Sequence, residues 1–363
     1  MLKYEAEERE LLEGLIDAIG ILPDGHAEID GREVAIGPHG RVDALIDARI
    51  GAQELQLLVE AKREGFPRDV REAVWQLRNH LAHMPSVDRE ILPFFIARAI
   101  SPGARDILRE ERVGFYDHGG SLYIPARHAF VYVDRPVPKK NAKIFVSLFQ
   151  GQKARVVQAV FDRRSDWLSV KELAESTEVS PATVSATLGE LERREWVDVE
   201  GAGPAKLRRL RSAKALVDAW SSYVADQKPP KLTRYYVPGS NALELAQQLD
   251  LACRDADAAY AVTAEAAAQL YAPYLSSISQ VKCRIEPGRR QEEALERLNA
   301  RPVAEGWNLG LLETRARGDV TVAESIGNVR LASPLQVYLD LLQGSGRSRE
   351  MAAHLRSERL EAQ

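Results

Sequence analysis

The chain of 363 residues is long enough for two or three domains, and its composition, 45% hydrophobic and 28% charged, is that of a globular protein. A net charge of -4 excludes a general attraction to nucleic acid, so any affinity for DNA must come from a local basic patch. Two cysteines are too few for a disulfide framework, and the polar start MLKYEAEERE is unlike a signal peptide. No apolar run reaches the roughly 18 residues of a membrane span. We therefore expect a reduced, cytoplasmic protein that makes no contact with a membrane.

The first segment, residues 1–135, has the pattern of an α/β domain. Its predicted elements are a helix over 4–19, strands over 33–37, 41–50 and 55–62, a helix over 67–81, a strand over 91–100, a helix over 101–111 and strands over 114–124 and 129–134. Ser101 is expected to cap the helix that follows it. The segment therefore begins with the order αβββαβ.

Two more domains are predicted, which makes the chain a multi-domain α/β protein. A proline-rich, basic stretch at 134–143 is expected to be a linker. The second domain, 141–215, carries three helix patterns and a two-stranded wing over 197–210. A second linker-like stretch, 225–240, leads into the third domain, 230–363, which mixes alanine-rich helices with short strands and is expected to be α+β.

A carboxylate and a lysine stand together at the end of the strand over 55–62. Residues i and i+2 of a strand share a face, so Glu60 and Lys62 point to the same side. If Gly51 and Ala52 form a tight turn, this strand pairs with 41–50 as a hairpin whose partner numbers sum to about 103. That register places Asp43 opposite Glu60, and Asp47 opposite Gln56.

Opposed carboxylates on one face suit a divalent cation. Side-chain roots in such a pair lie roughly 5 Å apart, and Mg²⁺ takes oxygen ligands in this way. Asp43 and Glu60 are therefore the predicted metal ligands, Lys62 could orient a water molecule, and Gln76 of the next helix could reach the same site. The alternative is a surface ion pair between Glu60 and Lys62 without chemistry. In the first case the pair points into a shared polar cleft with Asp43; in the second it points to solvent.

The element order and the phrases VDAL, VEAK and VWQL resemble the PD-(D/E)XK nuclease fold. The resemblance implies metal-dependent phosphodiester hydrolysis with the four residues Asp43, Glu60, Lys62 and Gln76. It also suggests a carboxylate from the first helix, either Glu10 or Glu13. Val42 replaces the proline or other small residue that the family usually has before the aspartate.

The phrase LSVKELAESTEVSPATVSATLGELERREWV predicts a helix-turn-helix. Ser180 is expected to cap a second helix with Pro181 in its first turn, while Val184, Leu188 and Leu191 face the core. Short side chains near its start allow a close approach to a DNA groove. The residues expected on that exposed part are Ala182, Thr183, Ser185, Ala186 and Thr187.

Basic residues follow this helix. Residues 193–214 hold seven of them against three acidic residues. This excess lies on the wing, where DNA phosphates would lie. The predicted DNA contacts are Ser180, Thr183, Ser185, Thr187, Arg193, Arg194, Lys206, Arg208 and Arg209. The segment resembles winged helix-turn-helix regulators; the alternative is a protein-interaction module with a solvated basic face.

The ending SPLQVYLDLLQGSGRSREMAAHL, with VTAEAAAQLYAPYL and FFIARAISPGARDILREERVGFYDHGGSLYI, resembles the AbiEi-type antitoxins of type IV toxin–antitoxin systems. The family often has an asparagine where this chain reads DHGGS. The resemblance implies a regulator that represses its own promoter, with double-stranded DNA and a nucleotidyltransferase-like toxin as partners and a homodimer on an inverted repeat. We favour this interpretation over the alternative, a Mg²⁺-dependent DNA endonuclease targeted by its winged helix.

Overall fold

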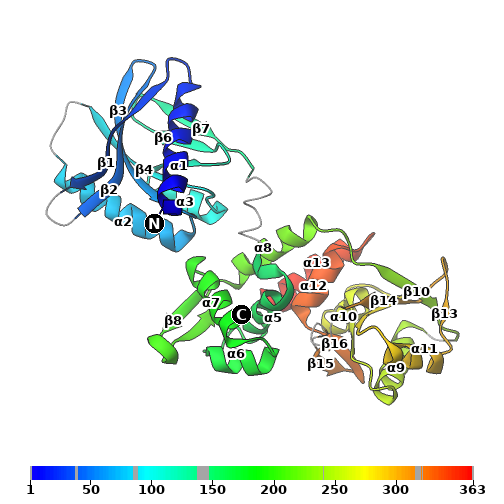
Figure 1. The fold of residues 1–363 in the computed structure, drawn as a ribbon. Coiled ribbons are helices and arrows are strands. Elements are labelled where there is room, and N and C mark those ends of the chain that lie inside the picture. The colour runs from blue at the N-terminus through cyan, green and yellow to red at the C-terminus, as the bar shows by residue number, and fades with distance from the viewer. Residues whose placement is uncertain are drawn as a thin grey trace. The chain divides into compact units, whose positions relative to one another are not determined.

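The computed structural model describes residues 2–36, 40–84, 89–136, 147–239, 241–314, 320 and 322–361. The chain forms two compact units, and each is described by itself. Unit 1 comprises Met1–Ser147 and the short segment Gly189–Glu195, and unit 2 comprises Leu148–Leu188 and Trp196–Gln363. Helices and strands alternate in both, which confirms the predicted α/β class (Figure 1). Most of the linker predicted at 134–143 lies outside the described residues, and the division into three domains stays a prediction.

Unit 1 is built on a seven-stranded sheet whose strands follow one another in chain order. They are β1 (His26–Ile36), β2 (Gly40–Ile50), β3 (Gln53–Lys62), β4 (Glu90–Ala97), β5 (Gly114–Asp117), β6 (Leu122–Pro125) and β7 (Phe130–Val133). Strands β3, β4 and β5 run parallel, and the other neighbours are antiparallel. With α1 (Leu2–Gly20) first and α2 (Pro67–His83) between β3 and β4, the predicted order αβββαβ is observed.

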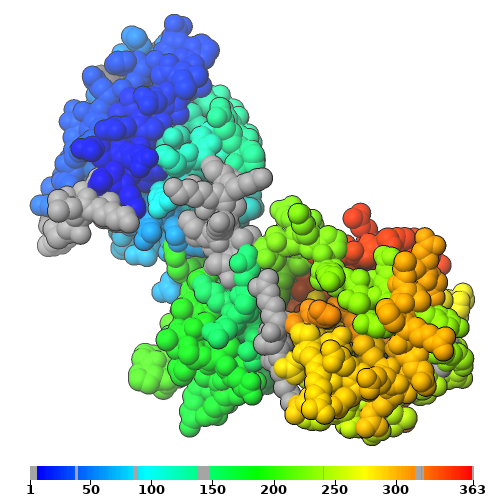
Figure 2. Space-filling view, turned by 45° about the vertical axis from the view of Figure 1, so that its right-hand side comes forward, coloured from blue at the N-terminus to red at the C-terminus, as the bar shows by residue number. Residues whose placement is uncertain are grey.

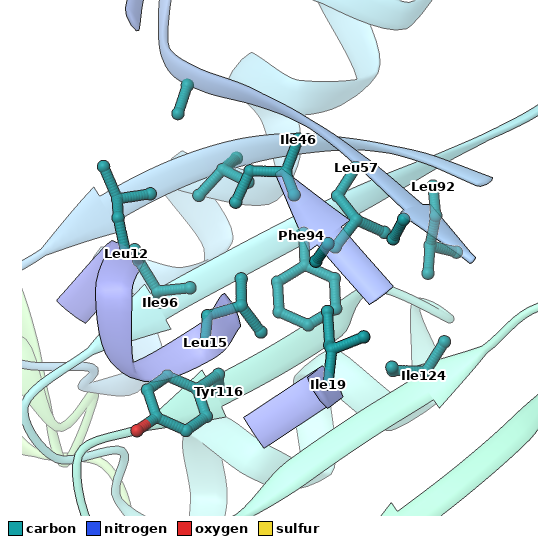
Figure 3. Packing of buried hydrophobic residues seen from close by; sticks show 14 of the residues in the cluster. Leu12, Leu15, Ile19, Ile46, Leu57, Leu92, Phe94, Ile96, Tyr116 and Ile124 are labelled. Atoms are coloured by element: carbon teal, nitrogen blue, oxygen red, sulfur yellow. The ribbon is translucent and has the colours of Figure 1, made fainter. Parts of the chain in front are cut away.

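Helix α1 covers one face of this sheet (Figure 3). Its apolar residues recur at helical spacing, so Leu12, Leu15 and Ile19 form one stripe that packs against Phe94 and its neighbours. All four of these side chains are fully buried. Burial of a leucine side chain stabilises a fold by about 1.5–3 kcal/mol, so the stripe fixes α1 on this face.

Helices α2 and α3 (Pro102–Glu110) cover the opposite face. Val70, Ala73 and Leu77 of α2 pack there with Leu58 of β3. The hydroxyl of Ser101 accepts a hydrogen bond from the amide of Ala104 at 3.4 Å, as its predicted capping role requires. Since side chains alternate along β3, the even-numbered residues of that strand turn toward α2.

Unit 2 begins with a winged helix. Its elements are α5 (Gly151–Asp162), α6 (Val170–Thr177), α7 (Pro181–Arg193), β8 (Val197–Glu200) and β9 (Leu207–Leu210). A guanidinium nitrogen of Arg155 donates to the carbonyl of Thr177, which ties the end of α6 to α5. Strand β9 pairs with β8 and also with Leu168, ahead of α6, so the wing is anchored on both sides.

The remainder of unit 2 holds a second seven-stranded sheet with the order β13-β10-β14-β12-β11-β16-β15. The strands are β10 (Leu232–Tyr236), β11 (Tyr260–Thr263), β12 (Val281–Ile285), β13 (Arg301–Pro302), β14 (Leu309–Glu313), β15 (Val322–Ile326) and β16 (Val329–Ala332). The helices are α8 (Ala213–Ala225), α9 (Ala242–Asp255), α10 (Ala264–Tyr271), α11 (Arg289–Arg297), α12 (Pro334–Leu342) and α13 (Ser348–Leu355), and a last turn spans Arg356–Leu360.

The linker-like interpretation of 225–240 is wrong in its middle. Strand β10 lies inside that stretch and pairs with β13 and β14, so its backbone groups are part of the sheet.

None of the helices in the described part of the chain combines the length and apolar character needed to cross a membrane.

Candidate functional site

The hairpin of β2 and β3 has the predicted register. Ile50 pairs with Gln53 across the turn, Asp47 with Gln56, and Ala44 with Val59. The backbone ladder stops there. One step further, a carboxylate oxygen of Asp43 accepts a hydrogen bond from the amide of Ala61 at 2.6 Å. A side chain of β2 thus continues the contact to β3 where the backbone pairing ends, and it holds Asp43 beside the end of β3.

Glu60 and Lys62 form an ion pair, with 2.7 Å between the ammonium nitrogen and a carboxylate oxygen. The pair therefore combines features of both predicted alternatives: the carboxylate is buried like that of a cleft residue, and the ammonium group is partly exposed like that of a surface ion pair. Glu60 is only 6% exposed, whereas the side chain of Lys62 is 32% exposed. The pair is formed because residues two apart in a strand share a face and a buried carboxylate needs a countercharge.

The pKa values of both carboxylates are raised, so a nearby cation would stabilise their charged forms. Burial raises the pKa of Asp43, although the amide of Ala61 and the charge of Lys62 lower it in part. Burial also raises the pKa of Glu60, the charge of Asp43 raises it further, and Lys62 opposes both effects. One lysine therefore does not compensate this pair of partly desolvated carboxylates.

A cavity of about 480 Å³ opens beside Glu60. Its lining consists of Ile36, Gly40, Arg41, Glu60, Trp75, Gln76, Asn79, His80 and His83. Gln76 thus lies at the same cavity as Glu60, as the sequence predicts. Asp43 and Lys62 adjoin Glu60 but do not line this cavity, so the predicted cleft shared by all three is only partly correct.

Gln76, which lines the cavity, carries a side-chain oxygen that lacks a described partner. The side-chain oxygen Oε1 of Gln76 is buried and has no hydrogen-bond partner in the described part of the chain. An amide oxygen and two carboxylates are the hard oxygen donors that Mg²⁺ prefers, so the side chains fit such a cation. Among the described residues, no group of three or more His, Cys, Asp and Glu side chains is arranged as a metal site. Metal binding by Asp43 and Glu60 stays a prediction.

His80 belongs to the same surroundings and was not predicted. Burial lowers its pKa, His83 lowers it further, and Asp43 opposes this shift. The sequence signal was present, since His80 follows Gln76 by one helical turn. By contrast, the suggested carboxylates of α1 lie elsewhere. A carboxylate oxygen of Glu10 lies 3.7 Å from a ring nitrogen of His118, and one of Glu13 lies 3.7 Å from a guanidinium nitrogen of Arg9. Both glutamates are away from Glu60 because α1 covers the other face of the sheet.

The start of α7 has the exposed surface that the sequence predicts, with one exception. Ser180 accepts a hydrogen bond from the amide of Thr183 at 3.3 Å, and Ser185 is exposed. Pro181, Ala182 and Ala186 are exposed as well. Thr187 is fully buried, and its hydroxyl donates to the carbonyl of Thr183 at 2.7 Å. The prediction that Thr187 faces solvent is wrong, because it lies on the same stripe as Val184 and Leu191.

The wing projects from unit 2 as a light-green lobe in Figure 2. Arg209 lies over the ring of Trp167 at 4.6 Å and pairs with Asp198 at 3.4 Å, and Lys206 is half-buried. Arg208 is only 8% exposed, so its prediction as a phosphate contact is wrong. It shares the inward face of β9 with Leu210, two residues on.

Two further predicted DNA contacts are Arg193, the last residue of α7, and Arg194, which follows it, and both lie in the segment that clusters with unit 1. Arg194 is 7% exposed and therefore does not provide the solvent-facing cation that the sequence predicts. Burial lowers its pKa to about 10, which still leaves it charged at neutral pH.

Comparison with solved structures gives low similarity over part of the chain. A repair endonuclease from Pyrococcus abyssi matches with 19% identity and a TM-score of 0.23, over 31% of this chain and 46% of its own. An EndoMS–dsDNA complex matches with 23% identity and a TM-score of 0.22, over 34% and 46%. An XisH family protein from Nostoc punctiforme matches with 11% identity and a TM-score of 0.22, over 35% and 98%. This chain thus spans about half of each endonuclease, and similarity this low assigns it no activity.

No curated protein matches the chain in sequence. One segment does match a family: residues 151–206, from the first helix of unit 2 to the turn of the wing, match the model of the MarR family.

Proposed function

We propose that this protein is a DNA-binding regulator whose winged helix contacts duplex DNA. The observation that carries the proposal is the exposed start of α7, within the segment that matches the MarR family. Only short side chains stand there, so the helix backbone can approach a major groove closely. We infer that Arg209 of the wing and Arg211, an exposed residue just after β9, contact phosphates beside the groove.

The finer proposal, supported by the resemblance to AbiEi-type antitoxins, is that the protein represses its own promoter as a homodimer and is paired with a nucleotidyltransferase-like toxin. The test is a gel-shift titration with the chain's own upstream region and a scrambled competitor. Tighter binding to the upstream region is expected, and equal affinity for both would remove the regulator proposal.

The same titration, repeated over a range of salt concentrations, tests the wing. In the variant Arg209→Ala/Arg211→Ala, binding should weaken on both DNAs. The slope of log binding constant against log salt concentration should fall in magnitude by about one for each lost phosphate contact. Arg289→Ala is the matched control, since this arginine of α11 has an 89% exposed side chain and lies outside the winged helix. An equal effect of the control would mean that only total charge matters.

A second candidate function is hydrolysis of phosphodiester bonds by unit 1. The observation that favours it is the convergence of Asp43, Glu60 and Lys62 at the end of β3, beside a cavity that Gln76 also lines. A bound divalent cation would neutralise the phosphate and stabilise the charge of the leaving oxygen. Asp43 and Glu60 would hold the cation, with the amide oxygen of Gln76 as a neutral donor.

The residues of the chain have separate parts in this reaction. The amide of Ala61 fixes the carboxylate of Asp43 before any ligand arrives, so this side chain loses little entropy on binding. Lys62 holds its ammonium group against Glu60, from where it can orient a water molecule toward a phosphorus atom. Since Lys62 retains about a third of its exposure, the group can turn toward a substrate.

We expect Asp43→Ala and Lys62→Ala each to abolish Mg²⁺-dependent cleavage of DNA while leaving duplex binding intact. Asp47→Ala is the matched control, because Asp47 lies on the same strand but pairs with Gln56 and Arg89 away from Glu60. Calorimetric titration of the full chain with Mg²⁺ measures the cation directly. Absence of both cleavage and Mg²⁺ binding would leave the regulator proposal alone.

A further inference from the structure

A tryptophan stands exposed at the rim of the cavity in unit 1. Trp75 keeps 65% of its surface exposed, whereas Gln76, its neighbour on α2, is half-buried inside the cavity. Trp75, Asn79 and His83 follow one another at intervals of four residues and form an exposed outer row. At 1.5 Å per residue this row is about 12 Å long.

Among the described residues, those that line the cavity with Trp75 do not continue its apolar surface. The exposed side chains along the rim are polar: Asn79, His83 and Arg41, whose side chain is 71% exposed. The one aliphatic residue of the lining, Ile36, is only 7% exposed. A protein-docking surface would extend the apolar patch around its central aromatic residue. The rim instead combines one flat ring with hydrogen-bond donors.

This combination fits a nucleotide, which has a flat base, a sugar with hydrogen-bonding groups and a phosphate. Stacking requires that one face of the base is free. Inside a duplex both faces are covered by the neighbouring base pairs, so an unpaired base is the one that is free to stack on a side chain. Glu60, across the cavity, then lies on the side where the phosphate of that nucleotide would be held through a cation.

We propose that Trp75 stacks on an unpaired base, so that the cavity selects single-stranded DNA or the single-stranded tail of a duplex. Asn79 and His83 contact the sugar and phosphate of the same strand. The inference deepens the second candidate function, and it rests on that function for the cleavage that follows binding. The binding itself depends on the rim residues alone.

The test measures binding of the full chain in Ca²⁺, which replaces Mg²⁺ to prevent cleavage. Three labelled DNAs of equal length are compared by fluorescence anisotropy: a single strand, a blunt duplex and a duplex with a single-stranded tail. Trp75→Ala should weaken binding of the single strand and the tailed duplex by about 5- to 150-fold, the range that corresponds to the loss of one base–aromatic stack, and should leave the blunt duplex unchanged. Trp75→Phe should retain most of the affinity, because it keeps an aromatic plane.

Phe130→Ala is the matched control, since Phe130 is a 72% exposed aromatic residue of unit 1 outside the cavity lining. The inference is overturned if the wild-type chain does not bind single strands, if Trp75→Ala affects all three DNAs equally, or if the control behaves like Trp75→Ala. Failure of the hydrolysis proposal is distinguishable. A chain that cuts no DNA in Mg²⁺ but loses single-strand binding in Trp75→Ala keeps the binding site, whereas equal cleavage of the single strand by the wild-type chain and by Trp75→Ala keeps the hydrolysis and removes the role of Trp75.

Discussion

Glu60 is the residue at which function and stability conflict. Its carboxylate is buried, lies near the charge of Asp43, and is paired with a single lysine. Because burial and Asp43 raise its pKa above the unfolded value, the native unit binds a proton at this position more tightly than the unfolded chain does. This residue therefore lowers the free energy of unfolding as pH rises from about 4.3, the unfolded value, through the native pKa.

Glu60→Gln should consequently stabilise the cation-free protein above this pH window. The amide keeps an acceptor for Lys62 and removes the charge, and a gain of about 1 kcal/mol is expected, or roughly 2–4 °C in the unfolding transition of unit 1. The gain should vanish below pH 4, where Glu60 is itself protonated. Differential scanning calorimetry at pH 4 and pH 8 measures it, and Glu54→Gln, at an exposed position near the start of β3, is the control. A loss of stability at pH 8 would show that Lys62 compensates the charge fully.

Single residues also mark the limit of sequence-based prediction. Thr187 and Arg208 have polar side chains on elements that were placed correctly, but both face inward. The helical repeat puts Thr187 on the stripe of Val184, and the two-residue repeat puts Arg208 on the face of Leu210. Periodicity fixes orientation better than side-chain polarity does.

At the scale of elements, hairpins and amphipathic helices were predictable. The register of β2 and β3 follows from the turn at Gly51 and Ala52, and α1 follows from its leucine stripe. Elements without such a pattern were missed. The first half of β1 is polar and largely exposed, and β10 lies in a stretch with three prolines, so both were taken for loops. The lining of the cavity by Trp75 and His80 was also beyond prediction, because it depends on which face α2 turns to the sheet.

The packing of β4 against β5 yields a further prediction. A Cβ atom at Gly114 would lie 2.4 Å from the ring of Phe94 and 3.1 Å from the carbonyl of Tyr123. Because Phe94 is fully buried, its ring cannot move aside. Gly114→Ala should therefore lower the free energy of unfolding by about 1–3 kcal/mol, measured from the midpoint of urea denaturation.

The control for this substitution is Gly103→Ala in α3. The added methyl group there would meet only the Pro67 side chain at 3.7 Å, an ordinary contact. Since alanine favours helix over glycine, a gain of up to about 1 kcal/mol is expected. Similar losses at both positions would contradict the assignment of close packing to Gly114.

At the scale of the whole molecule, the two proposed functions lie in different units. The carboxylates and the cavity belong to unit 1, and the exposed start of α7 and the wing belong to unit 2. The sequence predicted both sites because each has a local pattern of its own. It could not show that Arg194 is buried, since that depends on contacts between residues far apart in the chain.

The hydrogen bond from the Ala61 amide to Asp43 affects how related sequences should be compared. It gives the aspartate a structural role, because it satisfies a backbone group at the point where two strands diverge. A relative that has lost hydrolysis would still be under selection to keep an acceptor at this position, and asparagine would also serve. An aspartate here is therefore poor evidence for retained chemistry. Under the proposed hydrolysis, Glu60 and Gln76, which line the cavity, are the more informative positions for sorting active members of a lineage from inactive ones.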